Sequence, residues 1–365
     1  MIQKIVKTFN IIELIGDGIS KEITSEATKL LKIIEQNNNS IKFNITQYPI
    51  GYRCYKQYGS PITNEIINKC KNSDGVLLGA VGHPNANNLN SDLRPEKGLL
   101  RLREGMELYC NVRPVKVYDN LIDTSPVKSD IIRNTDIIFV RELSGGIYKS
   151  ECGILKEDYA EDIMKYSMYQ IERILRYAFK LALKRSKKLC IVDKSNVLNT
   201  SKLWRLCSLM VKDDYPNVDV EYQYIDAMSY LLIKKPQKYD VIVTANLFGD
   251  ILSDEAAILS SSLGMLPSMS LNDKKGGLYE PVHGSAPDIE GQGIANPTGT
   301  ILSLAMMLKQ LNLIYYGKSI EDSVSNVLEK NNYTKDINPS NIIKSLSTSE
   351  FGDAIVYEFQ KILKK

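Results

Sequence analysis

Short apolar runs and longer segments of helical periodicity alternate along the whole chain. Continuous apolar runs typical of buried strands occupy residues 11–15, 76–81, 137–140, 189–192 and 241–244. Residues 41–48 and 218–225 instead alternate apolar and polar positions, which is typical of strands with one buried side. We therefore predict a strand at each of these places.

Segments with helical periodicity connect these strands. Apolar residues recur at intervals of three and four over residues 157–185, 201–213, 297–311 and 317–330. A further helix is expected to begin at Ser20, whose hydroxyl can cap it. Its predicted apolar face consists of Ile23, Ala27, Leu30, Leu31 and Ile34. The alternation of strand and helix predicts an α/β protein with mixed sheets.

The first predicted strand ends in Gly16-Asp17-Gly18, and no G-x-G-x-x-G sequence follows it, so a Rossmann fold is not expected. A P-loop sequence is absent as well. A nucleotide would therefore need another loop. Residues 279–298 contain several glycines and lead into the helix expected at Pro297, where backbone amides can approach phosphates. The alternative is an ordinary surface connection, which glycine and proline also favour.

Composition narrows the class of protein. A chain of 365 residues is too long for one ordinary core, so two domains are expected. A formal charge of +3 gives no field that would attract nucleic acid. The six scattered cysteines suit a reducing compartment, and no apolar run is long enough to span a membrane. These observations favour a cytoplasmic protein without a nucleic-acid or membrane partner.

Asp250 and Asp254 are four positions apart, so on a helix both carboxylates project from one face. Like charges at this spacing destabilise a helix by about 0.2–0.5 kcal/mol. Magnesium or manganese would remove the repulsion, because both ions prefer carboxylate oxygens. With only two histidines in the chain, a zinc site of the usual type is not expected. The alternative is a charged helix start, where aspartates are stabilised by the helix dipole.

Three arginines suggest what such a metal site would face. Arg103 and Arg113 flank an apolar, helix-like segment, and Arg141 follows a predicted buried strand. A guanidinium group in such a place needs an anionic partner, and its forked donors match a carboxylate. Each arginine could equally form a structural salt bridge. Taken with the aspartates, they predict a small acidic substrate that carries more than one carboxylate.

Seven segments, in order along nearly the whole chain, resemble the β-decarboxylating dehydrogenases. They are RPEKGLLRLR at 94–103, NVRP at 111–114, VRELSGGIY at 140–148, VDKSNV at 192–197, DAM at 226–228, GDILSD at 249–254 and HGSAPD at 283–288. Within this family the chain is most similar to the isopropylmalate branch. The resemblance implies NAD-dependent oxidative decarboxylation of 3-isopropylmalate to 2-oxo-4-methylpentanoate, a step of leucine biosynthesis. A D-malate or tartrate dehydrogenase and a non-catalytic regulatory subunit of the same fold remain the alternatives.

The resemblance also implies roles for the charged residues. Asp250 and Asp254, with Asp226 from the partner subunit, would hold Mg²⁺ or Mn²⁺ against the substrate. Lys194, also from the partner, would take the proton of the substrate hydroxyl, and Tyr148 would protonate the enol. The carboxylate that is lost would be bound by Arg103, Arg113 and Arg141.

The same resemblance implies that NAD binds to the loop that contains Asp288. A carboxylate at this position accepts hydrogen bonds from the adenosine ribose and repels the extra phosphate of NADP. The other expected cofactor contacts are His283, Gly284, Ser285, Ala286, Pro287 and Asn296.

Substrate choice is expected to depend on Glu96, Leu99, Leu100 and Val197. The three aliphatic side chains would receive the isopropyl group, whose burial stabilises binding by roughly 2–2.5 kcal/mol. Lys97 could attract a third carboxylate, but we expect it to point to solvent. By analogy with the family, residues 1–108 and 262–365 would form a cofactor domain. Residues 109–261 would carry the metal and the interface of a homodimer with shared active sites.

Overall fold

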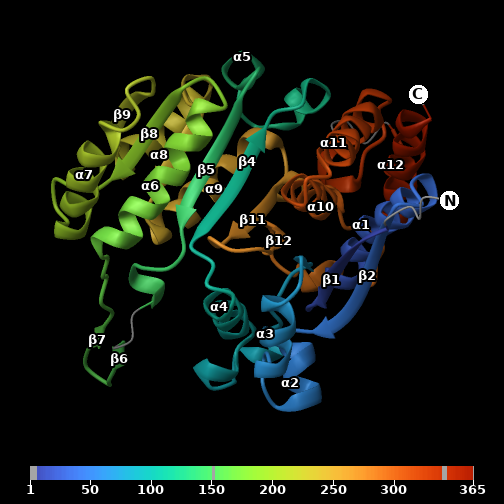
Figure 1. The fold of residues 1–365 in the computed structure, drawn as a ribbon, viewed down its shortest axis with the longest axis horizontal. Helices are drawn as coiled ribbons and strands as arrows, with labels where there is room; N and C mark the ends of the chain where they lie inside the picture. The colour runs from blue at the N-terminus through green and yellow to red at the C-terminus, as the bar shows by residue number, and fades with distance from the viewer. Residues whose placement is uncertain (1–5, 150–152, 339–342, 365) are drawn as a thin grey trace. The chain divides into compact units, whose positions relative to one another are not determined.

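The computed structural model describes residues 6–149, 153–338 and 343–364. The chain divides into two compact units, drawn in Figure 1. Both ends of the chain, Met1–Glu107 and Ser262–Lys365, make the first unit, and Leu108–Ser261 makes the second. Each unit is built around strands of a mixed sheet.

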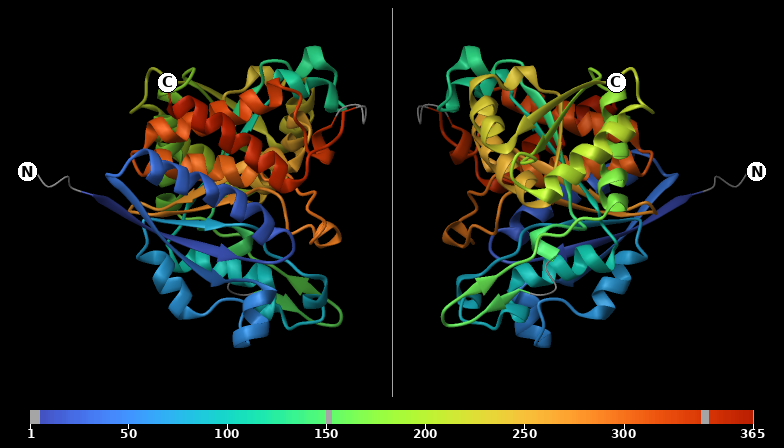
Figure 2. Two further views of the ribbon diagram at one scale, coloured as in Figure 1. Left: turned by 90° about the vertical axis from the view of Figure 1, so that its right-hand side faces the viewer. Right: turned by 90° about the vertical axis from the view of Figure 1, so that its left-hand side faces the viewer.

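The first unit contains β1 (Lys7–Ile15), β2 (Ile41–Pro49), β3 (Gly75–Leu78), β11 (Pro267–Leu271) and β12 (Gly277–Pro281). Their order is β2-β1-β3-β12-β11, with β11 antiparallel to β12 and the other pairs parallel. Helices α1 (Ser20–Asn37), α10 (Thr298–Gln310), α11 (Ile314–Glu329) and α12 (Thr348–Leu363) pack together. Figure 2 shows α10–α12 on one side of these strands and α2 (Tyr52–Tyr58), α3 (Asn64–Lys71) and α4 (Pro95–Gly105) on the other.

The second unit contains β4 (Cys110–Lys116), β5 (Asp136–Glu142), β8 (Lys188–Asp193), β9 (Asp219–Tyr224) and β10 (Val241–Thr244). Their order is β4-β5-β10-β8-β9, and β4 is antiparallel to β5 while the other pairs are parallel. The helices are α5 (Ser129–Ile132), α6 (Met168–Leu183), α7 (Asn199–Lys212), α8 (Ile225–Lys234) and α9 (Asn246–Glu255). A small hairpin joins β6 (Ile154–Leu155) to β7 (Ala160–Glu161).

The strands predicted from apolar runs and from alternation are all present, and the α/β class with mixed sheets is confirmed. The helix predicted over residues 157–185 is wrong in its first part. Ala160 pairs with Leu155 in the hairpin, and the helix begins only after Ser167. Ser167 and Gln170 form a reciprocal capping box there, which satisfies backbone donors at the true start.

Ser20 does not have the capping role that was predicted for it. The residue that precedes α1 is Ile19, which makes no side-chain cap. The Ser20 hydroxyl instead accepts a hydrogen bond of 2.8 Å from the backbone N–H of Gly16. Ser20 therefore stabilises the turn between β1 and α1 rather than the helix itself.

Candidate active site

Helix α9 carries Asp250 and Asp254 on successive turns, as the spacing predicted. No acidic residue lies in the first turn of this helix, so the explanation of a charged helix start is wrong. Asp254 is the last residue but one of α9, where the helix dipole disfavours a negative charge. The two carboxylates therefore need positive partners from elsewhere.

Arg113 and Arg141 provide that charge from the antiparallel strands β4 and β5. Arg113 donates to Asp254 Oδ1 at 3.0 Å and to Asp250 Oδ1 at 3.4 Å. Arg141 donates from NH1 to the same Oδ1 of Asp250. Both arginines are buried, at 6% and 3% exposure, so their charges depend on these partners.

Two uncharged side chains also contact Arg113. Its Nε donates to Asn111 Oδ1 at 2.8 Å, and its NH1 donates to Ser253 Oγ at 2.7 Å. Sequence reasoning missed both contacts. Ser253 lies inside the GDILSD segment and Asn111 begins the NVRP segment, so their position beside matched residues was the available signal.

Tyr148 lies in a short helical turn, Ile147–Lys149, and reaches the same cluster. Its hydroxyl donates to Asp250 Oδ2 at 3.0 Å, and the guanidinium of Arg141 lies 5.7 Å from its ring centre. Burial and the negative charge of Asp250 raise the pKa of Tyr148. The phenol is therefore held protonated, as a proton donor must be.

The fit of this cluster to a divalent cation can be judged from Asp254. Burial raises the pKa of Asp254, and nearby Asp250 raises it further, while Arg113 opposes the shift. Arg113 therefore does not compensate fully for the cost of ionising Asp254, although this side chain is 54% exposed, and a hard cation would favour the ionised form. Within the described ranges, no group of three or more His, Cys, Asp or Glu side chains gathers as a metal site. One chain thus brings two of the three predicted metal ligands together.

Lys194 and Asp226 form a second group in the same unit. Lys194 directly follows β8, Asp226 lies in the first turn of α8, and Lys194 Nζ forms an ion pair with Asp226 Oδ1. A hydrogen bond from Lys194 and one from the backbone lower the pKa of Asp226. The Asp226 side chain is 65% exposed, so it is available to a second molecule.

In the first unit, Arg103 of α4 has a partner that sequence reasoning missed. Its NH2 donates to Glu280 Oε1 of β12 at 2.7 Å, and both side chains are largely buried. Nε of Arg103 is buried without a hydrogen-bond partner in the part of the chain that the structure describes. That donor is suited to an acceptor from a ligand.

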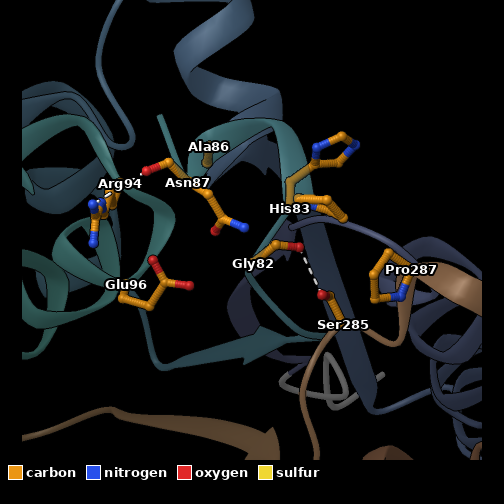
Figure 3. Close-up of a pocket in the computed structure, with 9 residues that line it drawn as sticks. Gly82, His83, Ala86, Asn87, Arg94, Glu96, Ser285 and Pro287 are labelled. Carbon is orange, nitrogen blue, oxygen red and sulfur yellow. Dashed lines mark hydrogen bonds between the residues drawn. The ribbon is translucent and has the colours of Figure 1, made fainter. Parts of the chain in front are cut away.

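The other predicted residues of α4 lie along one short helix. Glu96 lines a cavity of about 270 Å³ together with Gly82, Asn87 and Ser285 (Figure 3). Leu99 and Leu100 are half-buried, whereas Val197, in the second unit, is exposed. Lys97 is exposed and lies 3.7 Å from Asp92, which confirms that it points to solvent.

Hydrogen bonds hold the glycine-rich loop of residues 279–298 against Gly82 and against the segment that follows β1. The Ser285 hydroxyl donates to the carbonyl of Gly82 at 2.6 Å, and the Ser285 carbonyl accepts from Ile19 N at 3.0 Å. A Cβ at Gly18 would lie 2.0 Å from that carbonyl oxygen, so glycine is required there. These contacts order the loop.

Further along this loop, Ala286 adopts a left-handed backbone conformation with φ of 41°. The short helical turn Pro287–Ile289 follows it. The Asp288 carboxylate is exposed, and no hydrogen bond or ion pair engages it among the described residues. A Cβ at Gly284 would meet nothing within 4 Å, so the backbone there is open to a ligand.

His283 carries an unsatisfied acceptor. Its Nδ1 lies 2.8 Å from the carbonyl oxygen of Gly284, which can only accept, so Nδ1 bears the hydrogen. Burial lowers the pKa of His283 and keeps the ring neutral. Nε2 is then a buried acceptor with no partner in the described ranges. An amino group of a ligand could donate to it.

Asn296 differs from the neighbouring loop residues because its side chain is occupied within the protein. Its Oδ1 accepts from Thr298 N at 3.0 Å at the start of α10, and its Nδ2 donates to Asp336 at 3.1 Å. The side chain is buried, so its evident role is to hold the end of the loop against α10.

Comparisons with known proteins agree with these features. The isocitrate/isopropylmalate dehydrogenase family model matches residues 10–355, and the chain belongs to this family. Among characterised relatives, the 3-isopropylmalate dehydrogenase of Aquifex aeolicus is 46% identical over 98% of this chain and 99% of its own. That of Clostridium acetobutylicum is 45% identical over 97% and 100%.

Solved structures show the same fold. An isocitrate dehydrogenase from Methylococcus capsulatus superposes with a TM-score of 0.85 at 29% identity, covering 96% of this chain and 99% of its own. A β-decarboxylating dehydrogenase from Thermococcus kodakarensis gives a TM-score of 0.79 at 31% identity, and the match covers 98% of this chain and 97% of its own.

In the described ranges, none of the helices combines the length and apolar character that crossing a bilayer requires.

Proposed function

We propose that this chain is an NAD-dependent enzyme that oxidises and decarboxylates 3-isopropylmalate to 2-oxo-4-methylpentanoate. The observation that carries the proposal is the convergence of Arg113, Arg141 and Tyr148 on Asp250. This cluster offers carboxylate-binding groups, a metal ligand and a proton donor within one contact network. Relatives named 3-isopropylmalate dehydrogenase at 44–46% identity over nearly the full length support this choice of substrate.

A divalent cation, Mg²⁺ or Mn²⁺, fits the carboxylates of α9. Asp250 and Asp254 would hold it together with Asp226 of the partner subunit. When bound, the cation acidifies the substrate hydroxyl and stabilises negative charge on its oxygen after decarboxylation. It would also favour the ionised form of Asp254, whose pKa is raised by burial and by Asp250.

Substrate binding and the proton transfers are assigned to side chains of the protein. Arg103, Arg113 and Arg141 bind and orient the carboxylate that leaves as carbon dioxide. Lys194 is protonated in its ion pair with Asp226, so it would first release that proton to solvent when a cation occupies Asp226 and favours the neutral amine, and would then accept the proton of the substrate hydroxyl. Tyr148, protonated at the working pH, gives a proton to the carbon that has lost its carboxylate.

NAD, which accepts hydride when bound, would lie along residues 283–288. Asp288 is exposed and unengaged, so it can accept from the hydroxyls of the adenosine ribose. His283 Nε2 is the acceptor suited to the adenine amino group. Gly284, Ser285, Ala286 and Pro287 would contribute backbone contacts, and Asn296 would keep the loop in place.

Leu99, Leu100 and Val197 are the proposed contacts of the isopropyl group. Burying three carbons stabilises binding by roughly 2–2.5 kcal/mol, which is enough to prefer this substrate over unsubstituted malate. Glu96, which lines the cavity of Figure 3, would also contact the substrate.

A homodimer is part of the proposal, because one chain supplies an incomplete metal site. Large apolar side chains are exposed on α7, α8 and α9, and an apolar patch of this kind marks an interaction site where its members are contiguous. They are Leu206, Leu209, Met210, Tyr230 and Ile251. The hairpin residue Leu155 is also exposed, at 88%.

A substrate panel tests the proposed function. NADH formation is followed at the reduced nicotinamide band with 3-isopropylmalate, D-malate, tartrate and isocitrate, each with Mg²⁺ or Mn²⁺. We expect 3-isopropylmalate to give the highest kcat/KM. A preference for D-malate or tartrate would move the chain to a sister activity, and no turnover of any 2-hydroxy diacid would favour a regulatory subunit.

A further inference from the structure

Asn246 is the first residue of α9 and lies beside Arg141. Both polar atoms of its side chain form hydrogen bonds. It is 2% exposed and carries no charge. Its Oδ1 accepts two hydrogen bonds from Arg141, from Nε at 3.0 Å and from NH2 at 2.9 Å. One amide oxygen thereby fixes the plane of the guanidinium group, because two donors of a rigid fork are held at a single point.

The other end of the same amide holds the loop that leads to Tyr148. Nδ2 of Asn246 donates to the carbonyl of Gly145 at 3.0 Å and lies 3.4 Å from that of Leu143. The backbone N–H of Asn246 donates to the Tyr166 hydroxyl at 2.9 Å. Asn246 therefore links Arg141 to residues 143–146, just before Tyr148.

Only an amide satisfies this arrangement. An aspartate could accept from Arg141, but its second oxygen would face the two carbonyl oxygens and could donate nothing to them. Its negative charge would also neutralise Arg141, which then would attract a carboxylate ligand less strongly. A neutral acceptor orients the guanidinium group without adding a second negative charge to that of Asp250.

Gly249, one turn further along α9, gives independent support. A Cβ at this position would lie 2.7 Å from Cγ and 2.8 Å from Cβ of Arg141. Only glycine lets α9 approach strand β5 closely enough for Asn246 to reach the guanidinium group. The close approach and the double hydrogen bond act on the same side chain.

We propose that Asn246 is a positioning residue that sets the orientation of Arg141 and of the Tyr148 loop for binding of the diacid substrate. The proposal rests on the proposed function, because it takes Arg141 as a ligand of the substrate carboxylate. It assigns Asn246 an effect on substrate affinity that a helix-start residue with a purely structural role would not have.

The test compares Asn246→Ala, Asn246→Asp and Gly249→Ala with the wild type in steady-state kinetics with 3-isopropylmalate, NAD and Mn²⁺. We expect each to raise the KM for the diacid about 10- to 100-fold, the range for losing a hydrogen bond to a charged group. The KM for NAD should stay within about twofold. Asn246→Asp should not restore affinity, although an acidic residue suits the start of a helix.

Ser303→Ala is the matched control. Ser303 is fully buried on α10 in the first unit, and its hydroxyl accepts from Ser268 N at 3.2 Å and donates to the carbonyl of Gly299 at 2.7 Å. This variant should lower the melting temperature while it keeps the KM for the diacid. The proposal is overturned if Asn246→Ala is destabilised like the control yet binds the diacid with unchanged KM.

The possible outcomes distinguish a failure of this proposal from a failure of the proposed function. A wild type that turns over no diacid refutes the proposed function, whatever the variants do. A wild type with the expected activity and an Asn246→Asp variant with normal KM refutes the role of Asn246 alone. If Asn246→Ala fails to fold, the KM values of Gly249→Ala and Asn246→Asp for the diacid decide whether Asn246 positions Arg141.

Discussion

The hydroxyl of Tyr148 donates to Oδ2 of Asp250, while Oδ1 of the same carboxylate accepts from Arg113 and Arg141. One carboxylate thus connects the proposed proton donor to the proposed carboxylate-binding groups. Because the nearby negative charge and burial raise the pKa of Tyr148, the phenol stays protonated at neutral pH. This arrangement makes the role of the hydroxyl directly testable.

Replacing Tyr148 with phenylalanine should lower kcat about 100- to 1000-fold, within the range for loss of a general acid. The KM for the diacid should change little, because the arginines and metal ligands remain. NADH formation measures both constants. Tyr159→Phe, at an exposed tyrosine on the hairpin, is the control and should behave as the wild type. An unchanged kcat in Tyr148→Phe would exclude the proton-donor role.

Replacing Asp254 with asparagine should remove the stabilisation that a divalent cation gives. Asparagine leaves the buried Arg113 with one charged partner fewer, so the variant without metal should be somewhat less stable than the wild type, although burial raises the pKa of Asp254. Mn²⁺ at 100 times its Kd should stabilise the wild type by about 2.7 kcal/mol. Thermal unfolding with and without Mn²⁺ measures this, and Asp213→Asn on the exposed end of α7 is the control.

An equal Mn²⁺-induced shift in Asp254→Asn and in the wild type would show that the cation binds elsewhere. The comparison needs no turnover, so it tests the metal site apart from the reaction.

The stability of the cofactor-free protein should depend on pH through His283. Burial lowers the pKa of His283 below 6.5, its ordinary value, so the unfolded chain binds this proton at a higher pH than the folded protein. The contribution to stability is therefore complete above pH 6.5 and is lost as the pH falls from there through the folded pKa.

Urea unfolding at a series of pH values compares the wild type with His283→Asn. The difference in unfolding free energy should shrink below pH 6.5 if the argument is correct. His83→Asn, at the only other histidine of the chain, provides the matched control. A difference that stays constant from pH 7.5 to 5 would contradict the burial of a neutral His283.

Replacing Asp288 with alanine should raise the KM for NAD about 10- to 100-fold, because hydrogen bonds to a charged acceptor are lost. The same change removes a repulsive charge, so the preference for NAD over NADP should fall. Glu290→Gln, an exposed acid two residues away, serves as the control. Retention of full discrimination against NADP in Asp288→Ala would exclude Asp288 as the ribose contact.

Sequence patterns predicted the parallel strands well, since their apolar runs follow from burial on both faces. They missed β4, whose sequence Cys110–Lys116 includes Asn111 and Arg113. These polar residues are tolerated in a strand because each finds a partner on α9 or a neighbour. Strand β11 (Pro267–Leu271) was missed as well, because serines break its apolar pattern. Strand β12 (Gly277–Pro281), which is parallel to β3, was also missed, so the predicted loop at residues 279–298 begins inside a strand.

The site residues divide in a similar way: those inside matched segments were predicted, and those outside them were not. Matched segments led to Asp250, Asp254, Arg113, Arg141 and Tyr148, which the structure brings into one network. Glu280 and Asn246 lie outside the matched segments, so no sequence signal pointed to their contacts with Arg103 and Arg141. Such pairings depend on tertiary packing, which local sequence does not specify.

The shared Oδ1 of Asp250 has a consequence for selectivity in a cell rich in small anions. In the ligand-free protein this oxygen already satisfies one donor on each of two buried guanidinium groups. Chloride or phosphate must displace an internal carboxylate to bind there and gains little in exchange. If Asp250 holds a cation as proposed, a ligand that binds this cation would draw the oxygen away from the arginines, and such a ligand would be favoured over a simple anion.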